Sequence, residues 1–187
     1  MTLREAGRQE AGEIVRVINA AFNPAESFFV DGDRIDLEQV LHYFEKGVFL
    51  VAAEPLAGRH CASGAAACTN QPGSRSKRLH GEMSGCVYVE LRGERAYFGL
   101  LSVDPARQKG GIGGALIAAA EEYGRAHGCL FMDLRIVNLR AELPAFYGKL
   151  GYTVAGTEEF TSGAPIKLPC HFIKMQKALS GGESATA

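Results

Sequence analysis

A run of glycines separates an apolar segment from a helical pattern near the middle of the chain: Gly110, Gly111, Gly113 and Gly114. The apolar segment at 97–103 ends at Asp104 and Pro105, because proline has no backbone donor and biases its predecessor toward an extended conformation. The helical pattern that follows ends at Gly128. A glycine turn entering a helix leaves the first N–H groups unpaired, and glycine lets a ligand approach the backbone closely. The spacing therefore predicts a site for phosphate or pyrophosphate.

Two nucleotide-binding motifs fit this turn less well. A nucleotide hydrolase loop requires Gly-Lys followed by Ser or Thr, whereas the Gly-Lys pair at 148–149 is followed by Leu150. A dinucleotide fingerprint fits the Gly-x-Gly at 111–113, but Leu116 stands where a third small residue belongs, and no second similar unit completes a doubly wound sheet. On the glycines alone, a strand–helix connection without a ligand is the remaining alternative.

The composition is that of one ordinary globular domain. The 187 residues are 47% hydrophobic and 22% charged, which is enough to bury a core, and the formal net charge is −1. This balance gives no support to a nucleic-acid or membrane partner, and no apolar run has the length of a membrane span or the position of a secretory signal. Cys86 and Cys129 stand in apolar segments that favour buried, reduced thiols. We therefore expect a cytoplasmic protein.

Hydrophobic periodicity predicts an alternation of strands and helices. Strands are expected at 2–5, 48–53, 85–91, 95–103, 129–137, 152–156 and 168–175. Helices are expected at 9–22, at 36–46, between the glycine turn and Gly128, and at 142–150, with Asn23-Pro24 ending the first. We expect a single domain over 1–179, followed by a disordered tail at 180–187.

Residues 54–82 interrupt this pattern. They are rich in Ala, Gly and Ser, and we expect a flexible insertion between two hairpin strands. Possible metal ligands occur within it at His60, Cys61, Cys68 and His80, but their spacing fits no structural zinc pattern. The segment is therefore interpreted as a surface loop, and we expect no metal requirement.

Two motifs identify a resemblance to the GNAT superfamily of N-acetyltransferases. The segment at 108–113, Gln-Lys-Gly-Gly-Ile-Gly, matches the superfamily's Gln/Arg-x-x-Gly-x-Gly/Ala loop for acyl-CoA pyrophosphate, with Val-x-Pro at 103–105 before it. The segment at 146–152 resembles its Tyr-x-x-x-Gly-Phe/Tyr sequence. The order of predicted elements is also that of the superfamily. The resemblance implies an α/β (α+β) fold, in which helices flank a single mixed, mostly antiparallel central sheet.

The resemblance implies acetyl-CoA as co-substrate. Main-chain groups of 101–103 would pair with the pantetheine arm as an added strand does, and the glycine turn would hold the pyrophosphate. The implied cofactor-binding residues are Leu101, Ser102, Val103, Gln108, Lys109, Gly110, Gly111, Ile112, Gly113, Gly114 and Asn138. For Asn138 the alternative is a capping or turn role, and its separation from Tyr147 is longer than the superfamily usually has.

Acetyl transfer to an amine needs a neutral nucleophile and a proton for the departing thiolate. By the resemblance, Tyr147 is the candidate general acid; its alternative is a packed helix aromatic. Tyr97 stands where some members carry a glutamate base. Asp133 occupies the position of an acid found in other members and is our candidate base, acting directly or through water; its alternative is a structural carboxylate paired with a nearby Arg or Lys.

The acceptor is expected to meet the loop at 25–36, which carries several acids and two aromatic residues. We expect substrate contacts from Phe28, Phe29 and Tyr97, and a weak preference for a cationic amine with an apolar part. The predicted function is direct acetyl transfer, in a ternary complex, to a primary amine of a small molecule. A protein or peptide acceptor and a non-catalytic acyl-CoA-binding module are the alternatives, and a homodimer is left open.

Overall fold

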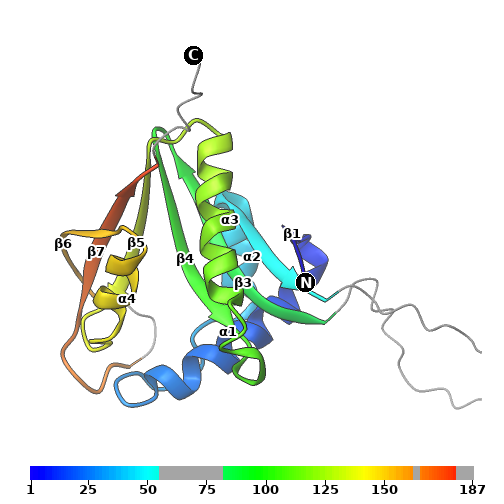
Figure 1. The fold of residues 1–187 in the computed structure, drawn as a ribbon. Coiled ribbons are helices and arrows are strands. Elements are labelled where there is room, and N and C mark those ends of the chain that lie inside the picture. The colour runs from blue at the N-terminus through cyan, green and yellow to red at the C-terminus, as the bar shows by residue number, and fades with distance from the viewer. Residues whose placement is uncertain (55–81, 162–164, 180–187) are drawn as a thin grey trace, which may run out of the picture.

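The computed structural model describes residues 1–54, 82–161 and 165–179. Within them, seven strands form one mixed sheet in the order β1-β2-β3-β4-β5-β7-β6 (Figure 1). Every neighbouring pair is antiparallel except β4 and β5, which run parallel. The predicted fold class and order of elements are confirmed. The predicted insertion at 54–82, with its four possible metal ligands, falls almost wholly outside the described residues, as does the predicted tail.

The strands are β1 Thr2–Glu5, β2 Val48–Ala53, β3 Met83–Arg92, β4 Arg95–Val103, β5 Phe131–Val137, β6 Thr153–Glu159 and β7 His171–Ala178. The helices are α1 Ala11–Glu26, α2 Leu37–Lys46, α3 Ile112–Ala126 and α4 Leu143–Lys149, with short 3-10 turns at Arg8–Glu10 and Pro105–Arg107. None of the helices in the described ranges has the length and apolar character needed to cross a membrane.

Three predicted boundaries need correction. Helix α1 continues past Pro24 to Glu26, because its last turn is still closed by the hydrogen bond from the Ser27 N–H to the Asn23 carbonyl at 3.1 Å. Strand β7 begins later than predicted because Pro169 cannot donate to a ladder. Strand β6 continues through Gly156, whose φ of 147° accompanies a register shift.

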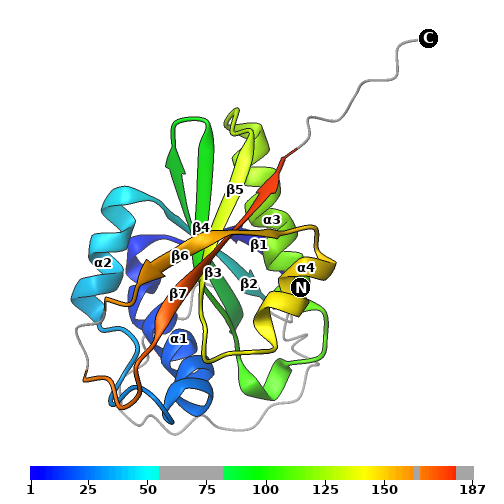
Figure 2. The ribbon, with the colours of Figure 1, turned by 90° about the vertical axis from the view of Figure 1, so that its left-hand side faces the viewer.

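The helices cover both faces of the sheet (Figure 2). Helices α1 and α2 pack on one face, where an apolar cluster includes Ile14, Ile18 and Phe49. Helices α3 and α4 lie on the other, where Leu116 and Phe98 belong to a second cluster. The branched and aromatic side chains of the strands alternate between these two cores, as a half-buried or doubly covered sheet requires.

Strands β4 and β5 pair only over Arg95–Tyr97 and Phe131–Asp133 and then diverge, which gives the sheet the open V visible in Figure 1. A register shift in the β3–β4 ladder and the positive φ of Leu100, 51°, mark a β-bulge where the strands separate. Strand β4 therefore keeps β3 as a partner on one side up to Val103, while its other edge is left without a strand neighbour after Tyr97. The candidate site is built around this opening.

Candidate functional site

The glycine turn enters helix α3 through left-handed backbone. Gly111, the N-cap residue, has a φ of 75°, and Lys109 has a φ of 72°. No side chain caps the helix, so its first N–H groups stay available to a ligand. A Cβ atom at Gly111 or Gly114 would have no neighbouring atom within 4 Å, so the turn presents an open backbone surface. A cavity of about 820 Å³ lies against it and has the size of a cofactor site.

Most of the predicted cofactor-binding residues line this glycine-turn cavity. They are Leu101, Val103, Gln108, Lys109, Gly111, Ile112, Gly113 and Gly114. Ser102 points instead into the core, where it is 1% exposed and its hydroxyl donates to the Leu100 carbonyl. Gly110 does not line the cavity. The unpaired edge of β4 and the open helix N-terminus together fit an acyl-CoA, whose pantetheine amides and pyrophosphate need these two kinds of partner.

Asn138 joins two strands. Its backbone N–H donates to the His171 carbonyl at 3.0 Å, and its side-chain Oδ1 accepts from the His171 N–H at 2.9 Å. It lines neither the glycine-turn cavity nor the cavity that contains Tyr147. This is the structural role that the sequence left as the alternative, and a cofactor contact from Asn138 stays a prediction.

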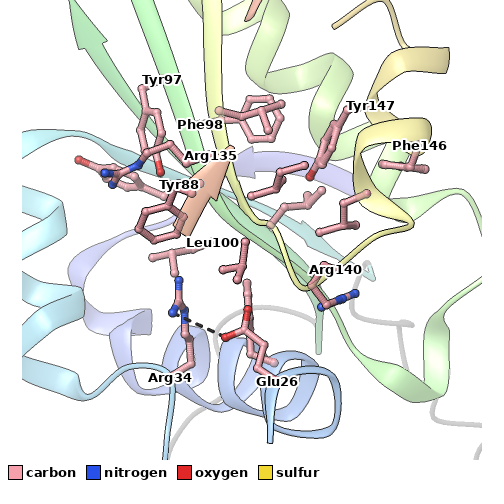
Figure 3. Close-up of a pocket in the computed structure, with 18 of the residues that line it drawn as sticks. Glu26, Arg34, Tyr88, Tyr97, Phe98, Leu100, Arg135, Arg140, Phe146 and Tyr147 are labelled. Atoms are coloured by element: carbon pink, nitrogen blue, oxygen red, sulfur yellow. Dashed lines mark ion pairs between the residues drawn. The ribbon is translucent and has the colours of Figure 1, made fainter. Parts of the chain in front are cut away.

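A second cavity, the central cavity of about 220 Å³, occupies the opening between β4 and β5 (Figure 3). It shares five residues with the glycine-turn cavity: Phe22, Leu101, Arg140, Leu143 and Phe146. On another side it shares five with an entry cavity of about 620 Å³ that α2 and β7 help to form: Arg34, Tyr43, Leu100, Arg135 and Phe172. The central cavity thus adjoins one space suited to a cofactor and another open to an acceptor.

Tyr147 lies in the wall of the central cavity and directs its hydroxyl into it (Figure 3). Its ring packs against Phe98 and Tyr152, with centroids 6.1 and 5.9 Å away. Pro144 lies in the first turn of α4, and the helix ends where the Tyr152 N–H donates to the Tyr147 carbonyl. Burial raises the pKa of Tyr147 to about 12, so the hydroxyl keeps its proton at neutral pH. The side chain is a packed aromatic with a proton available at its tip.

Glu26 also lines the central cavity, and sequence reasoning gave it no role. It ends α1 and is 6% exposed. Among the described residues its Oε2 has no hydrogen-bond partner; the nearest cation is Arg34, with Nη1 at 3.6 Å (Figure 3). Burial raises the pKa of Glu26, while the charges of Arg34 and Arg140 oppose that shift. A buried carboxylate with unused hydrogen-bonding capacity in a cavity marks a candidate for function.

Asp133 lies apart from Tyr147. Its Oδ2 accepts a hydrogen bond from Arg95 Nε at 2.6 Å, its Oδ1 accepts one from Arg95 Nη2, and Nη2 also donates to the Gln176 side chain. The pairing raises the pKa of Arg95. Asp133 lines a separate cavity on the β4–β5–β7 surface, and the structure does not bring it together with Tyr147. The pairing that the sequence offered as the alternative is therefore present, and the role as base stays a prediction.

Of the predicted acceptor contacts, only Tyr97 lines the central cavity. Phe29 is fully buried and stacks edge-on against Phe160, while Phe28 is 49% exposed beside Phe29. Neither reaches the cavity, because the chain between α1 and α2 turns Phe29 into a third apolar cluster.

The other acids near Glu26 have structural partners. Asp31 pairs with Lys167 at 2.7 Å, Asp33 accepts a hydrogen bond from Asn23, and Asp36 caps α2. No sequence signal separates Glu26 from these three residues. Only the continuation of α1 past its proline carries Glu26 into the cavity.

The sequence matches the acetyltransferase (GNAT) domain family over residues 46–154. None of the curated proteins matches it.

Solved structures share its fold at low sequence identity. The ribosomal-protein-S18-alanine N-acetyltransferase from Escherichia coli is 13% identical with a TM-score of 0.69, and the match covers 100% of this chain and 98% of that one. The structure of yncA from Salmonella typhimurium, solved with its cofactor acetyl-CoA, is 18% identical with a TM-score of 0.64, and the match covers 100% of this chain and 98% of that one. A nourseothricin acetyltransferase is 16% identical, with a TM-score of 0.65 and coverage of 96% and 98%. At these identities the likeness shows the fold.

Proposed function

The chain belongs to the GNAT acetyltransferase family, and from this premise we propose that it transfers the acetyl group of acetyl-CoA directly to a primary amine of a small molecule. The observation that carries the proposal is the position of Tyr147 between the glycine-turn cavity and the entry cavity. A small acceptor is favoured over a folded protein because the central cavity holds only about 220 Å³.

The glycine turn and the edge of β4 hold the cofactor in this proposal. The N–H groups that open α3 would bind the pyrophosphate, favoured by the positive end of the helix dipole. Main-chain groups of Leu101 and Val103 would pair with the pantetheine arm along the edge that β5 leaves free. Acetyl-CoA supplies the activated thioester when it is bound.

Tyr147 is proposed as the general acid. As the acceptor nitrogen forms its bond to the acetyl carbon and the carbon–sulfur bond breaks, the hydroxyl gives its proton to the departing sulfur. A pKa near 12 keeps this proton in place before the step, and the packed ring fixes the direction of donation. Positioned proton transfer of this kind contributes about 10²–10⁴-fold to the rate.

Glu26 is proposed as the group that takes the acceptor's proton. An ammonium must lose a proton before its nitrogen can attack, and Glu26 lies in the same cavity as Tyr147 with one oxygen free of hydrogen bonds from the described residues. Asp133 is the weaker candidate, since both its oxygens are bound by Arg95 in another cavity. The protons then balance: Glu26 takes the one that the ammonium loses before attack, Tyr147 gives its own to sulfur, and the one that nitrogen loses after attack returns to the Tyr147 oxygen.

The direct test is a panel of primary amines assayed for free-thiol release from acetyl-CoA, with the acetylated product identified by mass. We expect at least one small amine to give stoichiometric thiol and acetylamide. Binding of acetyl-CoA without turnover on any small amine, but with turnover on a peptide amine, would replace the proposal with the peptide alternative. Binding without turnover on either class would favour the non-catalytic module.

A further inference from the structure

The charges that line the central cavity do not match the cationic acceptor expected from the sequence. Three arginines line it, Arg34, Arg135 and Arg140, against the single carboxylate of Glu26. Arg135 and Arg140 also meet Glu158 and Glu142, each at 2.6 Å, but neither glutamate lines the central cavity. Among the residues that line the cavity, cations therefore outnumber carboxylates by three to one. A simple ammonium entering it would add a fourth cation.

Arg34 and Glu26 are held near each other without a hydrogen bond between them. Their closest atoms, Nη1 and Oε2, are 3.6 Å apart, beyond the usual range of a charged hydrogen bond. The Arg34 guanidinium lies 5.2 Å from the centre of the Phe22 ring, which holds it at the cavity wall. Figure 3 shows the two side chains facing each other across one side of the cavity. A ligand with both signs of charge could satisfy each of them more fully than they satisfy each other.

Arg135 stands where the central cavity meets the entry cavity. Its guanidinium carbon lies 5.0 Å from the ring centre of Phe172 and 5.4 Å from that of Tyr97, so the group is held between two aromatic rings. One terminal nitrogen binds Glu158, while the buried Nε has no hydrogen-bond partner among the described residues. Arg135 thus retains unused donor capacity at the passage an acceptor would take.

Resting on the proposed function, we propose that the acceptor is an amino acid with an apolar side chain, whose carboxylate is bound by Arg34 and Arg135 and whose amine is received by Glu26. A zwitterion adds no net charge to the cavity, and its two ends complement the arginines and the glutamate separately. Planar guanidinium groups suit a carboxylate because they can donate two parallel hydrogen bonds. Tyr43, Tyr97 and Phe172 supply an aromatic lining for the side chain.

The probes are three compounds of one shape: phenylalanine, phenylalaninamide and phenethylamine. Their dissociation constants are measured by calorimetry with CoA present, so that binding is read without turnover. We expect phenylalanine to bind about 10- to 100-fold more tightly than either compound that lacks the carboxylate, the range that lost hydrogen bonds between charged groups give. Leucine and isoamylamine repeat the comparison with an aliphatic side chain. Equal or tighter binding of the compounds without a carboxylate overturns the inference.

Substitutions of the two arginines test whether they bind the carboxylate of the ligand. Arg34→Gln and Arg135→Gln should each weaken phenylalanine binding by about 10-fold or more, and should not weaken phenethylamine binding. The control is Arg8→Gln, since Arg8 is an exposed arginine that meets Glu45 at 3.8 Å and lines none of these cavities. Loss of affinity for both ligands in equal measure would show that the arginines only shape the cavity, and would overturn their assigned role.

The outcomes separate this inference from the proposed function. Thiol release with phenethylamine but not with phenylalanine would keep the acetyltransferase and reject the amino acid. Carboxylate-dependent binding of phenylalanine without any thiol release would support the recognition site and reject the proposed transfer.

Discussion

Two glutamates of the described chain are buried to the same degree and used in different ways. Glu26 and Glu121 are each 6% exposed. Glu121 accepts hydrogen bonds from Lys177 and from the Tyr152 hydroxyl at 2.9 Å, and a further one from Arg125 at 3.2 Å. Glu26 has only Arg34 at 3.6 Å and an oxygen without a partner among the described residues.

The contrast teaches that burial alone does not identify a functional carboxylate. Glu121 ties α3 to β7 and to the start of β6, and its lone pairs are engaged. A fully satisfied buried network of this kind rigidifies a fold. Burial removes the Glu26 carboxylate from water, and the protein supplies it with few hydrogen bonds in exchange. A buried carboxylate of this kind is retained mainly where a ligand completes the site. The following predictions separate the region around Glu26 from the region around Glu121.

The largest effect is expected at the glycine turn. Gly111→Asp places a negative side chain against the proposed pyrophosphate site and should abolish thermal stabilisation by acetyl-CoA. Gly93→Asp is the matched control. Gly93 has a positive φ of 67°, close to the 75° of Gly111, and a Cβ there would also meet open space, but Gly93 lies at the tip of a hairpin. Full stabilisation of a folded Gly111→Asp variant by acetyl-CoA would remove the turn from the site.

Tyr147→Phe should lower the rate of the chemical step by about 10²–10⁴-fold, because it removes the proposed proton donor and keeps the ring. Affinity for acetyl-CoA and the free energy of unfolding should change little. The control is Tyr152→Phe, which removes the hydroxyl bound to Glu121 and should affect stability rather than rate. A single-turnover rate equal to that of the wild type would return Tyr147 to a packing role.

Glu121→Gln should reduce the free energy of unfolding by about 3 kcal/mol, because it leaves the half-buried Lys177 ammonium without its carboxylate, whereas Arg125 keeps Glu122 at 2.9 Å. Urea unfolding measures this loss. The turnover of the folded fraction should stay near that of the wild type. A large loss of turnover with unchanged stability would reverse the comparison between the two glutamates.

A smaller effect concerns pH. A base acts when it is ionised, so activity should rise as pH rises through the pKa of Glu26, which burial places above the usual range of a glutamate. The positive charges of Arg34 and Arg140 oppose this shift. Tyr147 acts when protonated, and its pKa of about 12 leaves the alkaline side of the profile unaffected by it at ordinary pH. An acid limb at the pKa of an exposed glutamate would count against Glu26.

Much of this molecule could be predicted from local sequence signals. The glycine turn, the hairpin and the order of elements follow from residue type and periodicity, and Tyr147 follows from a motif. The roles of the carboxylates of Asp133 and Glu26 could not be predicted in this way. Asp133 is bound by Arg95 because two distant strands pair in parallel, and Glu26 reaches the cavity because a hydrogen bond from Ser27 extends α1 past its proline. The first fact depends on a tertiary contact between distant strands, and the second on a local helix end that the Asn-Pro pair at 23–24 does not signal.

The central claim is that Glu26 serves the reaction, whereas Glu121 serves the fold. The most direct measurement is the single-turnover rate of Glu26→Gln against pH, beside its unfolding free energy. We predict a rate lowered by about 10²–10⁴-fold, loss of the acid limb seen in the wild type, and no loss of stability. A wild-type rate with an unchanged acid limb would contradict the claim, as would a loss of activity that follows loss of the fold.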